Sequence, residues 1–121
     1  MLFNNNQPIY LQILELINYK IMNKEWIPDE RIPSVRDLAM EYEVNPNTVM
    51  RAYEILQSSE IIYKRRGVGY FLSLDAREKT VQHSKNEFIS NELPKVFAKL
   101  ETFGITISEL ESIYSIYKAQ K

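Results

Sequence analysis

Two helix-start signals that lie close together constrain this chain more than any other feature of its sequence. The segment Ser34–Asp37 has the form of a capping box, in which the Ser34 hydroxyl accepts a hydrogen bond from the Asp37 N–H. Asn45 then places a capping side chain directly before Pro46, and proline is favoured in the first turn of a helix. The sequence therefore predicts two short helices joined by about three residues.

Apolar residues recur at helical spacing in these two segments and in an earlier one, which opens at Pro8 and runs through Asn23. Two short helices that follow an earlier helix form the core of a helix-turn-helix. The residues expected to be buried are Tyr10, Ile13, Leu14, Ile17 and Ile21 in the first helix, Val35, Leu38, Ala39 and Tyr42 in the second, and Val49, Ala52, Tyr53 and Leu56 in the third.

A β-hairpin is predicted directly after the third helix. The β-forming residues of Ile61–Tyr63 and Tyr70–Leu72 flank the glycine-bearing turn Lys64–Gly69. A short edge strand is expected at Arg31-Ile32, at the end of a loop that contains two prolines. A hairpin in this place turns a helix-turn-helix into a winged helix-turn-helix.

Beyond Asp75 the strand pattern disappears, and apolar residues recur at helical spacing over Val81–Leu100. Pro94 should kink or divide this helix, because its ring clashes with the preceding turn. Gly104 is suited to end a helix, and Thr106 is suited to start a last one. Helices this short cannot bury their apolar faces alone, so we expect them to pack on a second copy of the chain.

The expected fold class is therefore mainly α-helical with a small β-hairpin. We expect residues 1–75 to form a winged helix-turn-helix, a fold that is often a DNA-binding domain, and residues 76–121 to form a short helical dimerisation region.

The composition argues against several other classes of protein. The chain contains no cysteine and a single histidine, His83, so thiolate chemistry and a recognisable metal site are excluded. No side chains are placed for acid–base catalysis, and Gly67–Gly69 lacks the helix and the Lys-Ser/Thr pair of a phosphate loop. We therefore expect no enzyme, no cofactor and no metal. The sequence has no run near the roughly 18 apolar residues that span a bilayer and no secretory signal, which is typical of a cytoplasmic protein without a membrane partner.

Charge by itself gives weak support for DNA binding. The formal net charge is −1, and residues 1–75 hold eight Lys/Arg against ten Asp/Glu, which gives −2. The one tight basic cluster is Lys64, Arg65 and Arg66. A winged-helix module that binds proteins instead of DNA is therefore an open alternative, and a salt-dependent shift with duplex DNA would distinguish the two.

Three motifs, in order and at matching spacing, resemble the GntR family of bacterial regulators. Ile32–Ala39 (IPSVRDLA) resembles LPS-x-R-x-LA, Val44–Tyr53 (VNPNTVMRAY) resembles VNPNTV-x-RAY, and Arg65–Phe71 (RRGVGYF) is similar to the family's RGxGxF wing. The tail, with Phe103–Leu110 near its end, more loosely resembles the YtrA-like subfamily, whose members carry a small helical dimerisation region.

The resemblance implies a double-stranded DNA-binding homodimer that usually represses, and YtrA-like members often regulate transporter operons. A two-fold symmetric dimer predicts an inverted-repeat operator. A small-molecule effector is left open. Four residues depart from the family pattern where it usually has glycine, and a non-glycine residue at positive φ is uncommon and mildly strained. They are Lys24, Asp29, Glu43 and Glu60.

Four residues at the start of the third helix are candidates for the major groove, because recognition helices touch base edges with their N-terminal residues. They are Asn45, Asn47, Thr48 and Arg51, and asparagine is suited to adenine. The pattern alone is equally consistent with an Asn45 that only caps and an Arg51 that is only solvated. The resemblance favours DNA contact.

Phosphate contacts are expected from cations outside this helix. Arg36 follows a helix cap, where the helix N-terminus favours the same anion. Lys64, Arg65 and Arg66 can lie over the backbone, while Gly67, which has no side chain, can approach the minor groove closely. The alternatives are a solvated Arg36 and a solubilising hairpin tip. The resemblance and the position beside a helix-turn-helix favour DNA.

Overall fold

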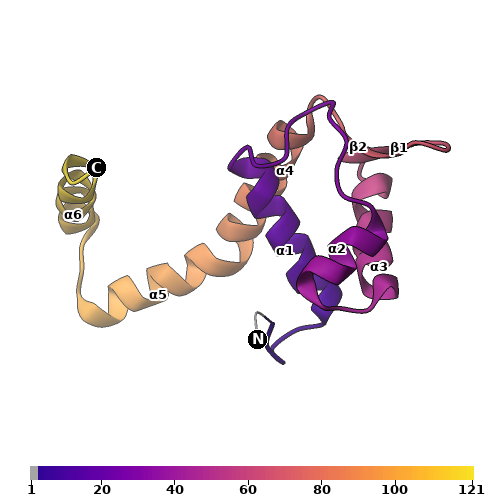
Figure 1. Ribbon diagram of the computed structural model, residues 1–121. Helices are drawn as coiled ribbons and strands as arrows, with labels where there is room; N and C mark the ends of the chain where they lie inside the picture. The colour runs from indigo at the N-terminus through magenta and orange to yellow at the C-terminus, as the bar shows by residue number, and fades with distance from the viewer. Residues whose placement is uncertain (1–2) are drawn as a thin grey trace. The chain divides into compact units, whose positions relative to one another are not determined.

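The computed structural model describes residues 3–121, and their contacts divide the chain into two compact units. The first unit ends at Gln82, and the second is His83–Lys121. The mainly helical fold with one small hairpin is as predicted (Figure 1). The elements of the first unit, in order, are α1 (Ile9–Met22), α2 (Val35–Tyr42), α3 (Pro46–Ser58), β1 (Ile62–Arg65) and β2 (Gly69–Leu72).

Both predicted helix starts are capped as expected. The Ser34 hydroxyl accepts a 3.0 Å hydrogen bond from the Asp37 N–H, and Asn45 Oδ1 accepts one of 2.8 Å from the Asn47 N–H. Pro46 opens α3, where its missing N–H leaves no helical hydrogen bond unmade. Residues 43–45 alone therefore separate α2 from α3, which is the short turn of a helix-turn-helix.

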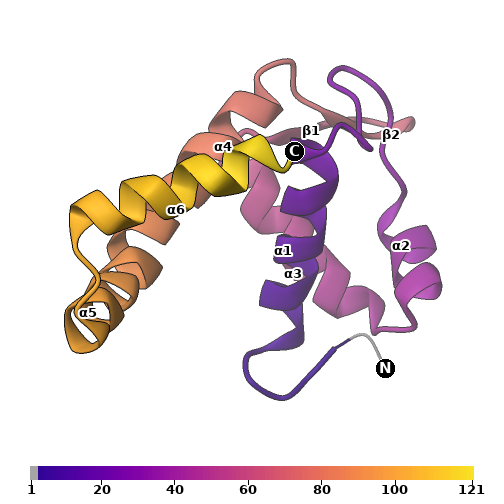
Figure 2. The same cartoon turned by 90° about the vertical axis from the view of Figure 1, so that its left-hand side faces the viewer.

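The core of the first unit lies between the three helices and the hairpin. In Figure 2, α1 passes in front of α3, and α2 lies to one side of them. The predicted core is confirmed for its central members, while Tyr10, Leu14, Val35 and Tyr42 are only half-buried at its margin. The buried cluster consists of Phe3, Ile13, Ile17, Ile21, Ile32, Leu38, Ala39, Val49, Ala52, Tyr53, Leu56, Ile61, Ile62, Leu72 and Ala76.

The wing is longer than the sequence indicated. β1 and β2 pair antiparallel from Ile62↔Leu72 to Arg65↔Gly69, so the ladder continues toward the tip. This extension depends on Gly69, because its φ of 142° favours glycine. The expected edge strand is a single bridge between Arg31 and Phe71.

The helix α4 (Ala76–Glu87) begins in the first unit, where Ala76 and Thr80 are buried. The first turns of α4 therefore complete the core of that unit, and a functional boundary after residue 75 stays a prediction. A π-helical turn, η1 (Phe88–Glu92), follows α4 and leads into α5 (Leu93–Phe103).

The division predicted at Pro94 is confirmed, because this residue lies in the first turn of α5 directly after η1. Pro94 has no N–H to donate to the preceding turn, and the wider π turn accommodates that break. Gly104 ends α5 with φ 69°, and the Thr106 hydroxyl starts α6 (Ile107–Ala119) by accepting a 3.1 Å hydrogen bond from the Glu109 N–H. Within residues 3–121, none of the helices combines the length and the apolar character needed to cross a bilayer.

All four non-glycine residues at the usual glycine positions have left-handed backbone. The φ angles are 63° at Lys24, 64° at Asp29, 55° at Glu43 and 59° at Glu60. The turns thus keep the geometry of the glycine-bearing turns at some cost in strain. Glu43 ends α2 in this conformation and directs the chain toward α3.

Candidate nucleic-acid interface

The outward face of α3 carries polar residues predicted to meet DNA bases. The helix buries a stripe that includes Val49 and Tyr53, so Asn47 and Arg51 on the opposite side are exposed. Thr48 is half-buried at the flank between these faces. The first two turns of α3 therefore offer short polar side chains and one cation to a ligand.

Two of these candidates also have a structural role. Asn45 caps α3 through Oδ1, and its amide NH2 remains able to donate to DNA. The Arg51 guanidinium lies over the Tyr10 ring of α1, with its central carbon 3.8 Å from the ring centroid. The Arg51 side chain is thus held against the first turn of α1.

The Tyr53 hydroxyl connects α3 to the chain just before α2. The Tyr53 hydroxyl donates to the Pro33 carbonyl oxygen at 2.7 Å, and the Tyr53 ring packs edge-on against Tyr70 of β2. Burial raises the pKa of Tyr53, so the hydroxyl stays protonated and keeps donating. Arg36, which is exposed in the first turn of α2, is thereby positioned relative to α3.

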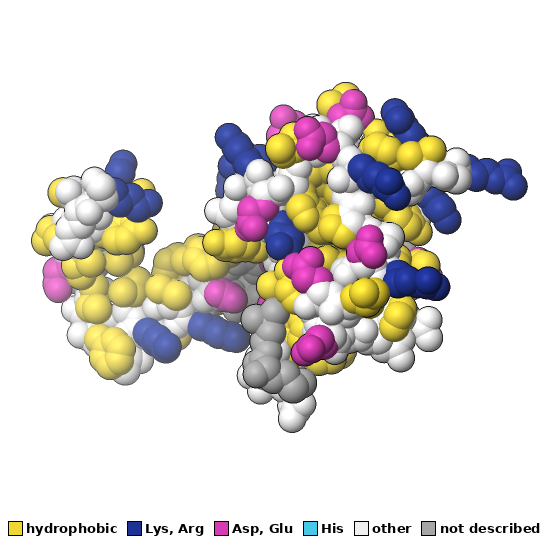
Figure 3. All heavy atoms as spheres, in the orientation of Figure 1, with side chains coloured by type: hydrophobic (Ala, Val, Ile, Leu, Met, Phe, Trp, Pro, Cys, Tyr) yellow, Lys and Arg dark blue, Asp and Glu magenta, His cyan; other side chains and the backbone are white. Residues whose placement is uncertain are grey.

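The wing carries a group of cations at its free end. Lys64 and Arg65 each lie over an aromatic ring of β2, with Nζ and the guanidinium carbon 5.5 and 4.6 Å from the ring centroids. Arg66 and Gly67 form the exposed tip, where Gly67 has φ 77°. Figure 3 shows the dark-blue Lys and Arg side chains projecting from the wing. The cations are therefore presented outward from a short two-stranded ribbon.

These cations are not neutralised by neighbouring carboxylates. Within residues 3–121, the salt bridges join Lys20 to Glu25, and Lys79 to both Glu60 and Asp75. Although the first unit is acidic overall, the cations of α2, α3 and the wing form no salt bridge within these residues, so their charge is available to phosphates.

Arg31 is a cation of this surface that the sequence analysis missed. It is exposed, it pairs with Phe71 at the edge of the wing, and its guanidinium covers the backbone of Gly69. A Cβ at Gly69 would lie 2.9 Å from the Arg31 Nε, so the glycine makes room for this arginine. The expected edge strand at Arg31-Ile32 was the available signal, because an edge strand adds its side chains to the face of a hairpin.

Tyr63 connects the wing to the loop before α2. Its ring stacks on Phe71 at 5.6 Å, and its hydroxyl donates a 2.7 Å hydrogen bond to the Asp29 carboxylate. This hydrogen bond raises the pKa of Tyr63, since it favours the protonated phenol. The left-handed turn at Asp29 therefore has a direct role in holding the wing.

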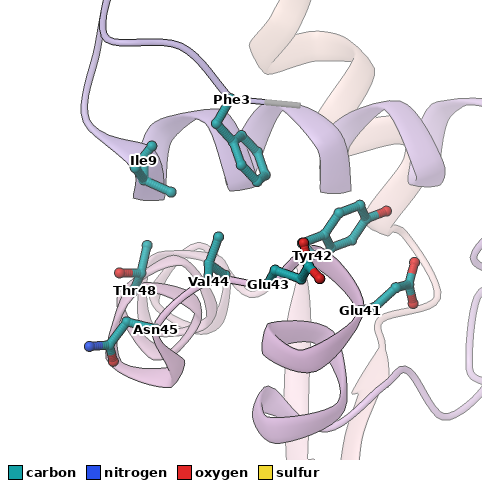
Figure 4. A pocket seen from close by; sticks show the side chains of 8 residues that line it. All are labelled: Phe3, Ile9, Glu41, Tyr42, Glu43, Val44, Asn45 and Thr48. Carbon is teal, nitrogen blue, oxygen red and sulfur yellow. The ribbon is translucent and has the colours of Figure 1, made fainter. Parts of the chain in front are cut away.

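A cleft of about 530 Å³ lies beside the start of α3, between the N-terminal segment, α1 and the helix-turn-helix turn. In Figure 4, Phe3 and Ile9 lie on one side, and Val44 and Thr48 point toward them from the other. The lining also includes two carboxylates, those of Glu41 and Glu43. Their negative charge disfavours a phosphate in this cleft, so DNA is better matched to the exposed side of α3.

The packing of α2 and α3 and the attached wing define a winged helix-turn-helix protein of the DNA-binding class. The chain belongs to the GntR family. The family model described as "Bacterial regulatory proteins, gntR family" matches residues 9–72, which is more than half of the chain.

Two regulators of Bacillus subtilis (strain 168) are similar to this chain over most of their length. The HTH-type transcriptional regulator YhcF is 34% identical over 108 residues, which cover 89% of this chain and 88% of YhcF. The HTH-type transcriptional repressor YtrA is 31% identical over 106 residues, which cover 88% of this chain and 81% of YtrA.

Solved structures agree with the fold and with DNA binding. A GntR-family regulator from Bacteroides thetaiotaomicron has a TM-score of 0.79 and 42% identity, covering 93% of this chain and 98% of that one. The DNA-binding domain of AraR in complex with operator ORX1 has a TM-score of 0.56 and 28% identity, covering 60% of this chain and 93% of that one. GntR regulators bind double-stranded DNA and are not enzymes, so this chain is a DNA-binding transcription regulator, as predicted.

Proposed function

We propose that this regulator is a repressor that binds an inverted-repeat operator as a homodimer. The observation that carries the proposal is the uncovered apolar face of His83–Lys121, in a chain whose other unit is a DNA-binding domain. A two-fold dimer presents two such domains, and two-fold symmetric proteins bind sites with matching symmetry.

The apolar face of the second unit supports the dimer. No residue of η1, α5 or α6 is buried within the chain. Phe97 is 47% exposed, Phe103 is 72% exposed and Tyr117 is 54% exposed. Apolar side chains exposed in such numbers mark an interaction surface, and short helices gain most of their stability by packing. A second copy of the chain is the partner we propose for this surface.

On DNA, α3 lies in the major groove with Asn47 and Thr48 toward the base edges and Arg51 beside them. The cations of α2 and the wing meet phosphates, and Gly67, which has no side chain, lets the tip of the wing approach the minor groove closely. The full set of proposed contacts is Arg36, Asn45, Asn47, Thr48, Arg51, Lys64, Arg65, Arg66 and Gly67.

Repression is proposed from the similarity to YtrA, whose name describes it as a transcriptional repressor. The likeness to that subfamily also supports a transporter operon as the regulated unit. We place the protein in the cytoplasm, where such an operator lies.

Selection of bound duplexes from a random pool by the full-length protein tests the DNA proposal. We expect an inverted repeat whose half-sites lie about one helical turn, 10–10.5 base pairs, or a multiple of it apart. The Arg36→Ala/Arg51→Ala variant serves as the control and should enrich the same site poorly. Enrichment of a single, unrepeated half-site by the wild-type protein would contradict the symmetric mode.

Sedimentation of full-length variants tests the dimer. Phe97→Glu should convert the protein to a monomer, because it buries a charge in the proposed interface. Ile27 of the first unit is 49% exposed, close to the 47% of Phe97, so Ile27→Glu is a matched control that should stay dimeric. A Phe97→Glu protein that still sediments as a dimer would move the interface elsewhere. A chain ending at Gln82 keeps Ala76 and Thr80 in place and should be monomeric.

A further inference from the structure

Tyr10 and Arg51 lie on different helices and meet at the edge of the proposed DNA-binding face. Tyr10 is in the first turn of α1, and Arg51 follows the exposed Asn47 on α3 by one turn. The central carbon of the Arg51 guanidinium is 3.8 Å from the centroid of the Tyr10 ring. At this distance the guanidinium lies directly over the face of the Tyr10 ring.

The contact with the Tyr10 ring does not use up the hydrogen-bonding capacity of Arg51. A guanidinium carries five N–H donors, and the ring holds the side chain through the attraction of its face for a cation. The side chain of Arg51 is exposed, and it forms no salt bridge with any residue in the described part of the chain. Its donors therefore remain open to a ligand while the side chain itself is held.

The contact is the closest of the cation–ring pairs found in residues 3–121. Lys20 lies 5.8 Å from the Tyr42 centroid, and Arg65 lies 4.6 Å from that of Phe71. The Tyr10–Arg51 pair also joins α1, which carries none of the proposed DNA contacts, to the helix that carries most of them.

We propose that Tyr10 is a positioning residue for DNA binding, which holds Arg51 ready for the operator before DNA arrives. Arginine loses much rotamer freedom when it is fixed on a ligand, and a side chain that is already fixed loses less on binding. This inference rests on the proposed contact between Arg51 and DNA. It means that α1, through Tyr10, contributes to the affinity for the operator.

Two substitutions of Tyr10 in the full-length protein distinguish the effect of the aromatic ring from that of an apolar side chain of similar size. Tyr10→Leu keeps an apolar side chain without a ring, and we expect it to weaken operator binding about two- to five-fold, the range of an exposed cation–π contact. Tyr10→Phe keeps the ring and should restore binding to within a factor of about two. Tyr19→Leu is the control, because Tyr19 is 58% exposed on the same helix and, among residues 3–121, no cation lies over its ring.

The same titrations in an Arg51→Ala background distinguish positioning from a structural role. If Tyr10 acts through Arg51, Tyr10→Leu has no further effect once Arg51 is gone, whereas a structural defect would weaken binding equally in both backgrounds. The slope of log K against log salt should be unchanged by Tyr10→Leu, because no charge is removed.

Equal losses in the two backgrounds, or wild-type affinity of Tyr10→Leu, would overturn the inference while leaving DNA binding intact. A wild-type protein that binds no selected duplex would instead overturn the proposed function, and the inference with it.

Discussion

The hydroxyl of Tyr53 lies 2.7 Å from the carbonyl oxygen of Pro33, so the helix proposed to read bases also holds the start of the helix that carries Arg36. Tyr53 is fully buried, and its ring packs on Tyr70 of the wing. The Tyr53 side chain therefore connects α3 both to the segment that leads into α2 and to the wing. The relative placement of these three elements depends on a protonated Tyr53 hydroxyl that donates its hydrogen bond.

Tyr53→Phe should lower the free energy of unfolding by about 1 kcal/mol, because the Pro33 carbonyl loses its donor. Burial raises the pKa of Tyr53 above its usual value near 10. The phenol therefore ionises more readily in the unfolded chain, and its stabilisation is complete below about pH 10 and declines above it, by about 1.4 kcal/mol per pH unit. Urea unfolding between pH 8 and pH 11 should show a shallower alkaline decline for Tyr53→Phe than for the wild type. Parallel declines would mean that this phenol does not govern alkaline stability.

Thr80→Val should stabilise the first unit. The Thr80 side chain is buried in α4, and its hydroxyl has no hydrogen-bond partner in the described part of the chain. A buried hydroxyl without a partner costs about 1–3 kcal/mol, so its replacement by a methyl group of similar volume should raise the free energy of unfolding by about 1 kcal/mol. Thr80→Ser keeps the hydroxyl and removes the methyl group, and it should destabilise. Thermal and urea unfolding measure both, and a destabilised Thr80→Val would indicate that the hydroxyl is satisfied.

Features that depend on neighbouring residues were predictable from the sequence. The caps at Ser34 and Asn45, the break at Pro94 and the stop at Gly104 each depend on the residue itself and the adjoining turn. The candidate DNA contacts on α2, α3 and the wing were proposed because short runs of adjacent residues resemble the motifs of the GntR family.

Features that depend on contacts between distant segments were not predictable. The Arg31 side chain can lie over the wing because Gly69 has no Cβ in its way. Tyr10 meets Arg51 only because α1 packs on α3. The change in composition near Asp75 likewise gave no sign that Thr80 belongs to the core of the first unit. Periodicity locates the buried side of a helix, but it does not say which other element lies against it.

Two substitutions of Glu43 should distinguish the effect of its backbone strain from the effect of its carboxylate charge. Glu43 has φ 55°, so Glu43→Gly should relieve left-handed strain and raise the free energy of unfolding by about 1 kcal/mol, after the extra entropy of an unfolded glycine is subtracted. Glu43→Gln keeps the strain and removes the charge, so its stability should change by less than about 0.5 kcal/mol. Both variants lose a carboxylate near the DNA face and should bind DNA more tightly at low salt. Urea unfolding and DNA titration give the two readouts, and a Glu43→Gly protein no more stable than Glu43→Gln would remove the strain argument.

Arg36→Ala and the Arg65→Ala/Arg66→Ala pair should weaken DNA binding without unfolding the protein. All three side chains are exposed, and none forms a salt bridge with a residue that the structure describes. Each lost phosphate contact should flatten the slope of log K against log salt by about 0.9, with a similar loss of affinity on every sequence. Lys24→Ala, which removes an exposed cation away from the proposed contacts, is the control. A variant whose salt slope equals that of the wild type has lost only a solvated charge.

The last prediction places sequence specificity on Asn47. Its backbone N–H is used by the Asn45 cap, but its side chain is exposed on the first turn of α3, the part of a recognition helix that comes nearest to base edges. Asn47→Ala should cost about 1–3 kcal/mol on the selected operator, the range of a bidentate base contact, and much less on random DNA.

Gln57→Ala is the matched control for Asn47→Ala, since Gln57 is an exposed amide in the last turn of the same helix. In a symmetric dimer the lost preference should appear at equivalent positions of both half-sites. Titration of the three proteins against operator and scrambled duplexes at one salt concentration measures these differences. Equal losses on both duplexes would make Asn47 a phosphate-contacting residue, and base recognition would then depend on Thr48 and Arg51.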